Sequence, residues 1–385
     1  MSNKHSNKPR TTLPDLKELG SRLKKVDQHI VALLSKRMTL AKQVQEWKKA
    51  NDNQPIIRFQ VEEERLEKIK VWAEKRGINP AFAKAVLYFI IAESCRVQIN
   101  HLQTKADDSE NLQDNLLNLT SAIAPSYNEY YGKCTNFATA SYIQFEDKEI
   151  KREIGTLKSM GNLDLALDLG CATGRITFGI ATHFKKTIGY DISPKMIEEA
   201  NKKKNDGLIS DDIEFTEIDI EKGIPIKNNS VSLVVMNLGT ASDVCNFRYI
   251  AAATKRVLKK DGRFVFSFYN TGALLYNWFV PWPPSLNAEI NLDSHCLDVK
   301  FQDKTFRINA RPYSVREVKK VLTENGLIVS TIKTYPTISP ILPSEFFDEE
   351  DSEKSNEIKK TIEEIDVNLA NLNKGAFILV TGRKP

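Results

Sequence analysis

The chain has 385 residues, of which 41% are hydrophobic and 27% charged, and its formal net charge is +5. This length exceeds what one hydrophobic core usually fills, so we expect at least two domains. No apolar run reaches the ~20 residues that a membrane span requires, and we expect no membrane association. Residues 1–12 lack an apolar stretch, which predicts a disordered tail and not a signal peptide.

The cysteines and the charge distribution narrow the choice of ligands and compartment. Residues 1–105 carry about ten more basic than acidic groups, which suits nucleic acid or an anionic small molecule. Because no nucleic-acid-binding motif is present, we expect small-molecule substrates. The cysteines show no metal-binding spacing, which predicts free thiols in a reducing cytoplasm and no metal site. They are Cys95, Cys134, Cys171, Cys245 and Cys296.

The N-terminal third shows the apolar periodicity of long helices. Apolar residues recur at alternating steps of three and four, which predicts a coiled-coil-like helix over 14–50. Arg37 falls in this apolar seam and Lys48 lies three turns further along the same face, so an anionic partner is expected there. A second helix is predicted over 62–73 and a third over 81–100. The apolar positions of the first are Leu19, Leu23, Val26, Ile30, Leu33, Leu40, Val44 and Trp47.

Residues 13–103 resemble the all-helical (type II) chorismate mutases. The resemblance rests on VDQHIVALLSKRMTLAKQVQEWK, the turn at Pro55 and a Ser94/Gln98 pair one helical turn apart. It implies a dimer through the N-terminal helices and the rearrangement of chorismate to prephenate, favoured by electrostatic stabilisation of the transition state. It also assigns roles: Arg37 would bind a carboxylate, Lys48 and Gln98 the ether oxygen, Glu62 the hydroxyl, and Ser94 would be an accessory contact.

Three departures separate this sequence from the family pattern. Gly20 stands where an arginine from the partner chain is expected, and Val61 replaces another substrate arginine. Arg58 replaces an acidic residue one turn before Val61 and, if that segment is helical, could restore the missing charge. Two alternatives therefore remain open: an active or retuned mutase, and a degenerate one kept for dimerisation.

The second half centres on a strand, a glycine-rich turn and a helix within 163–176. The apolar run ends at Asp168, and a second strand-like run ends at Asp191, about 20 residues beyond the glycines, where a ribose-binding acid is expected. The spacing Gly170-x-x-x-Gly174 is not the GxGxxG of a pyrophosphate-binding turn. The pattern thus predicts a nucleoside site without phosphates.

Asp168-Leu-Gly-Cys-Ala-Thr-Gly174, Asp191 with Met196, and Asp219 resemble the first motifs of class I S-adenosylmethionine-dependent methyltransferases. The family usually has glycine where this chain has Ala172, whose methyl group narrows the loop. The resemblance implies S-adenosylmethionine (SAM) as the cofactor. The implied cofactor-binding residues are Asp168, Gly170, Cys171, Ala172, Gly174, Asp191, Ile192, Met196, Asp219, Ile220 and Asn237.

An acceptor site is expected next to the transferable methyl group. The predicted strand over 231–238 ends at a loop, and loops at the carboxyl ends of parallel strands hold ligands. Aromatic residues precede the first strand, and an insert at about 270–311 reads as a lid with a hairpin. Arg307, Arg311 and His295 are its candidates for a carboxylate partner and a base. The predicted acceptor-binding residues are Tyr127, Tyr131, Thr240, Asp243, Trp278 and Arg311.

The expected architecture is therefore a three-helix all-α domain (13–103), a linker (104–122) and an α/β Rossmann-like methyltransferase domain (123–385) with a mostly parallel seven-stranded sheet. The expected function is methyl transfer to a small aromatic or carboxylate acceptor, joined to a chorismate mutase-like activity. The alternatives are a methyltransferase for an unrelated acceptor, prephenate-dependent synthesis of carboxy-S-adenosylmethionine and, outside this family, a nicotinamide dehydrogenase.

Overall fold

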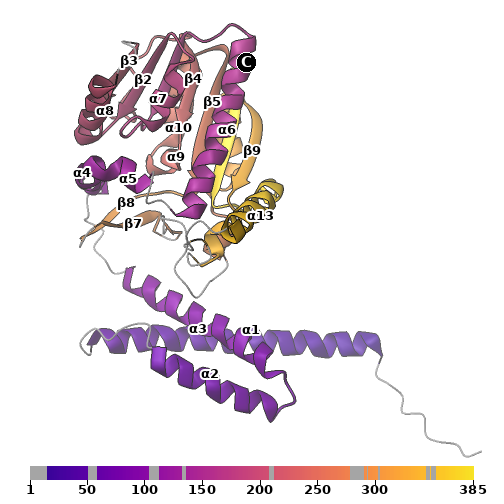
Figure 1. Ribbon diagram of the computed structural model, residues 1–385. Helices are drawn as coiled ribbons and strands as arrows, with labels where there is room; N and C mark the ends of the chain where they lie inside the picture. The colour runs from indigo at the N-terminus through magenta and orange to yellow at the C-terminus, as the bar shows by residue number, and fades with distance from the viewer. Residues whose placement is uncertain are drawn as a thin grey trace, which may run out of the picture. The chain divides into compact units, whose positions relative to one another are not determined.

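The computed structural model describes residues 15–50, 59–103, 112–131, 136–207, 212–277, 290–292, 294–301, 304–343, 347 and 353–385. The chain divides into two compact units, residues 1–106 and 107–385. Figure 1 shows the helical first unit and the sheet-containing second unit. Within the residues that the structure describes, no helix combines the length and apolar character needed to cross a membrane.

Three helices form the described part of the first unit: α1 (Leu16–Ala50), α2 (Phe59–Glu74) and α3 (Pro80–Gln103). The expected long helix is confirmed, and both α1 and α2 pack against α3. Ala41, Ala73 and Ile91 are buried between them. The apolar seam of α1, by contrast, is exposed along most of its length.

The second unit is built on a seven-stranded sheet, which confirms the expected α/β class. Its strand order is β3-β2-β1-β4-β5-β10-β9. The first five strands are parallel, and β10 is antiparallel to both of its neighbours, so β9 runs in the common direction. The strands are β1 (Leu165–Leu169), β2 (Lys186–Asp191), β3 (Ile213–Glu217), β4 (Val231–Met236), β5 (Leu258–Tyr269), β9 (Ile328–Tyr335) and β10 (Phe377–Arg383).

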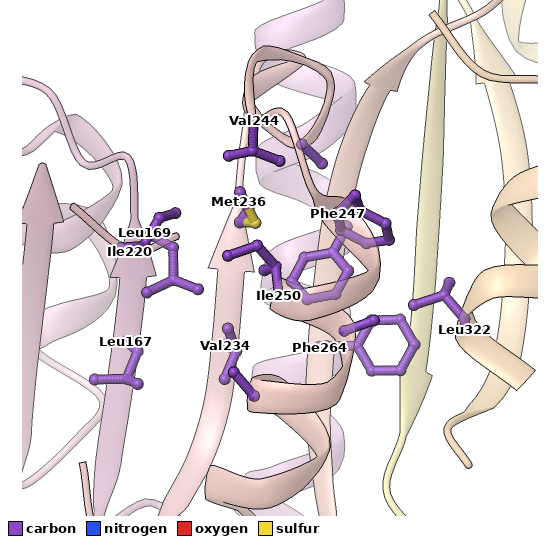
Figure 2. Close-up of a cluster of buried hydrophobic side chains, with 14 of the residues drawn as sticks. Leu167, Leu169, Ile220, Val234, Met236, Val244, Phe247, Ile250, Phe264 and Leu322 are labelled. Carbon is purple, nitrogen blue, oxygen red and sulfur yellow. The ribbon is translucent and has the colours of Figure 1, made fainter. Parts of the chain in front are cut away.

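Helices cover both faces of this sheet. One face packs against α10 (Phe247–Val257) and α12 (Val315–Glu324), and Figure 2 shows side chains of that core, among them Phe247 and Ile250 of α10 and Leu322 of α12. The other face packs against α6 (Phe137–Ser159) and α7 (Arg175–Ala181), while α8 (Pro194–Asp206) lies on β2 and β3. Because the central strands are buried on both sides, they read as continuous apolar runs.

Local sequence accounts for several helix starts. Ser193 caps α8, with Pro194 in its first turn, where a missing N–H costs nothing. Ser314 and Glu317 form a capping box at the start of α12, each side chain accepting the other's backbone N–H. The predicted hairpin is also present, as β7 (Cys296–Phe301) and β8 (Lys304–Asn309), with the short β6 (Ile290–Asn291) beside it.

Several helices lie outside the main sheet and its two covering layers. Helix α4 (Leu112–Ile123), most of which lies in the expected linker, packs against β8 and α8 and continues through η1 (Ala124–Ser126) into α5 (Tyr127–Tyr131). Two short helices, α9 (Thr240–Asp243) and α11 (Leu274–Asn277), follow β4 and β5. Near the C-terminus, α13 (Glu353–Leu369) carries a buried carboxylate, Asp366, that accepts three backbone N–H groups at the start of η2 (Ser339–Ile341).

Candidate functional site

The glycine-rich loop turns sharply between β1 and α7. Gly170, Ala172 and Gly174 all have positive φ angles, of 76°, 46° and 89°, a region that glycine enters without steric cost. The amides of Gly170 and Cys171 both donate to the carbonyl oxygen of Tyr190, at 2.7 and 2.9 Å. These two hydrogen bonds hold the turn at the end of β2.

Asp191 ends β2 directly opposite this loop. One carboxylate oxygen accepts the amide of Ala172 at 2.8 Å and the other accepts the amide of Ser193 at 2.9 Å. Burial raises the pKa of Asp191, although these amides lower it. Each oxygen keeps a second lone pair, so the carboxylate can also accept hydroxyl donors.

Asp219 lies just beyond β3, the strand next to β2. The amide of Ile218 donates to the carbonyl oxygen of Asp191 at 2.8 Å, which brings the two acidic segments together. One oxygen of Asp219 accepts the amide of Glu221 at 3.0 Å. The other lies 3.1 Å from the ammonium of Lys222 and 3.4 Å from the side-chain amide of Gln113, so α4 reaches this carboxylate.

A cluster of apolar residues packs against the glycine-rich loop. Met196 of α8 is buried against Ile123 and Ala124, and Tyr127 and Ala172 pack on the same cluster. Three other predicted cofactor residues are also described. Ile220 is buried in the main core, Cys171 is a buried free thiol whose pKa burial raises, and Ile192 directly follows Asp191.

Asp168 sits beneath the loop near the end of β1. Its carboxylate accepts the hydroxyl of Thr177 at 2.7 Å, while its other oxygen, Oδ1, is buried with no hydrogen-bond partner. Burial raises the pKa of Asp168 to about 6. A buried carboxylate oxygen without a donor is costly, which is typical of a position that a ligand or water completes.

The loop after β4 approaches the glycine-rich loop from the other side. A Cβ atom added at Gly170 would lie 2.4 Å from Cγ2 of Thr240, so the two loops are in contact. The amide of Thr240 donates to the carbonyl oxygen of Asn237 at 2.9 Å. Leu238 has a φ of 47° and Gly239 one of 84°, and their amides donate to Glu146 at 2.9 Å and to the Ser267 hydroxyl at 2.8 Å.

Glu146 is the main site residue that the sequence analysis missed. It is fully buried on α6, 3.5 Å from the guanidinium of Arg175, and its pKa is raised to about 7 by burial. Arg175 also pairs with Asp147 at 2.8 Å. The sequence does contain a signal: carboxylates recur at steps of three and four on the apolar face of a helix, beginning with this residue. They are Glu146, Glu149 and Glu153.

A cluster of tyrosines lies beside Asp243. The side chain of Tyr269 interacts electrostatically with Asp243 and with Tyr127, Tyr131 and Tyr276, and burial raises its pKa well above the ordinary value. Tyr127 also interacts with Asp168 and Asp191, which links this cluster to the glycine-rich loop. The predicted Tyr127, Tyr131 and Asp243 thus lie in one neighbourhood, to which the structure adds two residues of β5 and α11.

Of the two predicted acceptor-binding residues in the insert, the structure describes Arg311 only. Arg311 stacks on Tyr313 at 4.5 Å and lies 3.6 Å from Glu317, so its guanidinium is held against α12. Arg307 makes two hydrogen bonds to Asp298 across the hairpin, at 2.8 and 2.9 Å. Trp278 lies outside the described residues.

In the first unit, Lys48 and Ser94 are buried and Arg37 is half-buried. Ser94 donates to the carbonyl oxygen of Ile90 at 2.8 Å. Arg58 and the side chains of Glu62 and Gln98 lie outside the described residues. Gln45, one turn before Lys48, is a further buried polar residue that the sequence analysis did not single out.

Two family models match the chain. Residues 19–99 match chorismate mutase type II, and residues 163–291 match a methyltransferase domain. A probable S-adenosylmethionine-dependent methyltransferase of Saccharomyces cerevisiae, CRG1, is 30% identical over 161 residues, which cover 40% of this chain. The chain spans about half the length of that relative, 51%.

An archaeal relative and a solved structure extend these likenesses. The protein MJ1252 of Methanocaldococcus jannaschii is 26% identical over 217 residues, covering 55% of this chain and 81% of that protein. The structure of geranyl diphosphate C-methyltransferase from Streptomyces coelicolor A3(2) is 17% identical, with a TM-score of 0.38. The match covers 58% of this chain and 74% of the geranyl diphosphate C-methyltransferase chain.

Proposed function

We propose that this chain, whose residues 19–99 match chorismate mutase type II and whose residues 163–291 match a methyltransferase domain, uses SAM to transfer a methyl group to a small acceptor derived from a chorismate-type acid. The observation that carries the proposal is the position of two acids at the ends of adjacent strands. Asp191 accepts the amide of Ala172 in the glycine-rich loop, and Asp219 follows Ile218, whose amide donates to the carbonyl oxygen of Asp191. SAM supplies an electrophilic methyl group on a sulfonium centre.

The residues present fit this cofactor. The loop from Gly170 to Gly174 would take the methionine part, as the resemblance to the family implies, and its glycines allow the close packing of Thr240 and Phe215 around it. Asp191 would accept the ribose hydroxyls, and Asp219 would accept the amino group of adenine in place of Gln113. Ile192, Met196 and Ile220 would flank the base. The unpaired oxygen of Asp168 supports a ligand or water beneath the loop.

Catalysis by this chain would rest on positioning and on the exclusion of water. Helices α4 and α5 cover the loop, and the hydroxyl of Thr173 donates to Asn128 of α5 at 2.9 Å. Thr240 contacts Gly170 and would set where the acceptor meets the methyl group. Tyr127 and Tyr131 would flank the acceptor or the sulfonium.

We further propose that α1 mediates a homodimer. Its apolar seam is exposed, with Leu23 at 65%, Leu33 at 67% and Trp47 at 60%. A monomer rarely leaves a continuous apolar stripe of this length in water, so a second copy would cover it. Arg37 and Lys48, on the same helix, would then bind the carboxylate and ether oxygen of chorismate together with Glu62, Ser94 and Gln98.

One experiment separates the candidate reactions. The full-length protein is incubated with chorismate and SAM, and the products are followed by mass. Prephenate indicates an active mutase, and a gain of one methyl group on an acid derived from it supports the proposal. A gain of one carboxyl group on the cofactor would instead favour carboxy-S-adenosylmethionine synthesis. Rearrangement without either gain would leave the transferase with an unrelated acceptor.

Cofactor binding tests the site itself. Titration calorimetry with S-adenosylhomocysteine should give binding by the wild type, and Asp191→Ala and Asp219→Ala should each weaken it by at least about tenfold, the loss of one charge-assisted hydrogen bond. Asp261→Ala is the matched control, because this acid pairs with Arg383 at 2.8 Å, outside the site. Unchanged affinity in both site variants would contradict the assignment, as would tight binding of NAD.

A further inference from the structure

Asp243 ends the short helix α9, one turn after the contact between Thr240 and the glycine-rich loop. Its backbone carbonyl accepts the side-chain amide of Asn309 at 2.8 Å, and the backbone of Ser242 accepts the amide of Arg311 at 2.8 Å. The hairpin strand β8 and the segment that follows it therefore hold α9 in place. The position of Asp243 is fixed by its backbone and leaves its carboxylate available.

The carboxylate itself lacks partners. Its Oδ1 atom is buried and makes no hydrogen bond. The hydroxyl of Tyr276, in the same tyrosine cluster, is likewise buried without a partner. A buried donor and a buried acceptor without partners are both costly, and a substrate bound in this cluster can supply a partner to each of them.

The surroundings of Asp243 contain hydroxyl groups and no described cation. Tyr269 of β5 is the titratable group that interacts with Asp243, and Tyr276 of α11 with Tyr127 and Tyr131 of α5 lie in turn around Tyr269. Among the described residues, the two arginines of the insert are engaged elsewhere: Arg307 with Asp298 and Arg311 with Tyr313 and Glu317. Such a site disfavours a carboxylate as the reacting group, because no positive charge offsets the negative one.

Resting on the proposed methyl transfer, we propose that Asp243 is the proton acceptor of the reaction and that the methylated group is a weakly acidic hydroxyl, such as a phenol or an enol. The hydroxyl oxygen forms a bond to the methyl carbon while the carbon–sulfur bond breaks and its electron pair returns to sulfur. The proton of the hydroxyl passes to Oδ1 of Asp243. Tyr276, on the other side of Tyr269, donates a hydrogen bond to another oxygen of the substrate and orients it.

The electrostatics of Asp243 agree with this role. Burial raises the pKa of Asp243 to about 8, which makes its carboxylate a far stronger base than an exposed aspartate and brings it closer to the acidity of a phenol or enol. General-base catalysis is most efficient when the pKa of the base lies near the working pH. A carboxylate acceptor, which has already lost its proton, would gain nothing from such a base.

The test uses full-length protein, SAM and two probe acceptors, 4-hydroxyphenylpyruvate and phenylpyruvate. The two probes differ only in the phenolic hydroxyl group. Assays are kept short so that phenylpyruvate remains in its keto form. Methyl transfer under single-turnover conditions is detected by mass. We expect O-methylation of the hydroxyl probe alone, and a rate that rises with pH to a plateau above about pH 8. Asp243→Asn should lower this rate at least about a hundredfold and abolish its pH dependence.

Matched variants make the outcome decisive. Asp298→Asn, which changes an acid of the hairpin outside the cluster, should keep the wild-type pH profile. Tyr276→Phe should raise KM more than it lowers kcat and should also keep the profile. The inference is overturned if Asp243→Asn retains the rate, if phenylpyruvate becomes an ester, or if neither probe is methylated although S-adenosylhomocysteine binds. Absence of S-adenosylhomocysteine binding by the wild type would instead reject the proposed function.

Discussion

Glu146 of α6 accepts a hydrogen bond of 2.9 Å from the backbone amide of Leu238, which has a positive φ angle in the loop after β4. The two residues are 92 positions apart in the chain. The helix that precedes the first strand therefore sets the conformation of a loop beside the candidate acceptor site. The Glu146 carboxylate does so while buried, at a cost in free energy that its contact with Arg175 only partly offsets.

That cost predicts a pH dependence. The pKa of Glu146 is raised to about 7, from 4.5, so between these values the folded state binds more protons than the unfolded state, and this group's contribution to stability falls as pH rises. Glu146→Gln keeps an acceptor for the Leu238 amide but cannot ionise. From pH 5 to pH 8, the Tm of the wild type should therefore fall relative to the Tm of Glu146→Gln.

Glu146→Ala serves as the control, because it removes the acceptor as well as the charge. It should lower the free energy of unfolding by about 1–3 kcal/mol at pH 5, where Glu146→Gln is nearly neutral. Calorimetric scans at both pH values measure the two effects. Parallel Tm curves for the wild type and Glu146→Gln would show that the carboxylate does not titrate in this window.

The backbone of Ala172 is predicted to be strained. Its φ of 46° lies in the left-handed region, which costs an L-residue about 1–2 kcal/mol, whereas glycine pays about 0.5–1 kcal/mol in backbone entropy. Ala172→Gly should thus leave stability unchanged or raise it by up to about 1 kcal/mol. Denaturant unfolding measures the difference.

A second alanine provides the matched comparison. Ala252 is exposed within α10, so Ala252→Gly should destabilise the protein by about 1 kcal/mol through helix propensity. If Ala172→Gly lowered stability as much as Ala252→Gly, the left-handed conformation at residue 172 would be refuted.

Gly170 and Thr240 are predicted to be energetically coupled. Gly170→Ala places a Cβ atom 2.4 Å from Cγ2 of Thr240 and keeps a φ of 76°, which should cost about 2–4 kcal/mol. Thr240→Ser removes that methyl group, so the double variant should recover about 0.5–3 kcal/mol of the loss. Additive losses in a double-mutant cycle of unfolding would contradict the contact between the two loops.

Gly20 allows a test of the first unit. It lies inside α1, and a Cβ atom there would have no neighbour within 4 Å. Gly20→Ala and Gly20→Arg should each stabilise the helix by up to about 1 kcal/mol. If the family arginine is what the chain lacks, only Gly20→Arg should speed the rearrangement of chorismate, by about one to two orders of magnitude. Equal rates in both variants would argue for a site that has lost its activity in other ways.

Local patterns predicted much of the second unit. The strand-loop-helix at Asp168, the acid at the end of the next strand and the hairpin of the insert all depend on residues close in sequence, and each is present in the structure. The hairpin could be predicted because its two strands follow one another directly in the chain.

What escaped prediction depends on contacts between distant segments. Glu146 meets Leu238, Tyr269 meets Asp243, and α4 packs on β8 although its sequence reads as a polar linker. Periodicity tells which residues share a face of a helix, but it does not tell which strand or loop that face meets. The setting of Arg311, whose guanidinium lies against Tyr313 and Glu317, is a further example.

The packing of α4 has a practical consequence for dissecting the molecule. Gln113 reaches Asp219, Asn115 donates to the carbonyl oxygen of Arg307 at 3.1 Å, and Ile123 covers Met196. A fragment beginning at residue 124 would keep every strand of the sheet yet uncover Asp219 and Met196, where we propose that adenine binds. Any attempt to study the second unit alone should therefore cut the chain upstream of Leu112, because the segment that joins the two units also supplies the helix that covers the proposed cofactor site.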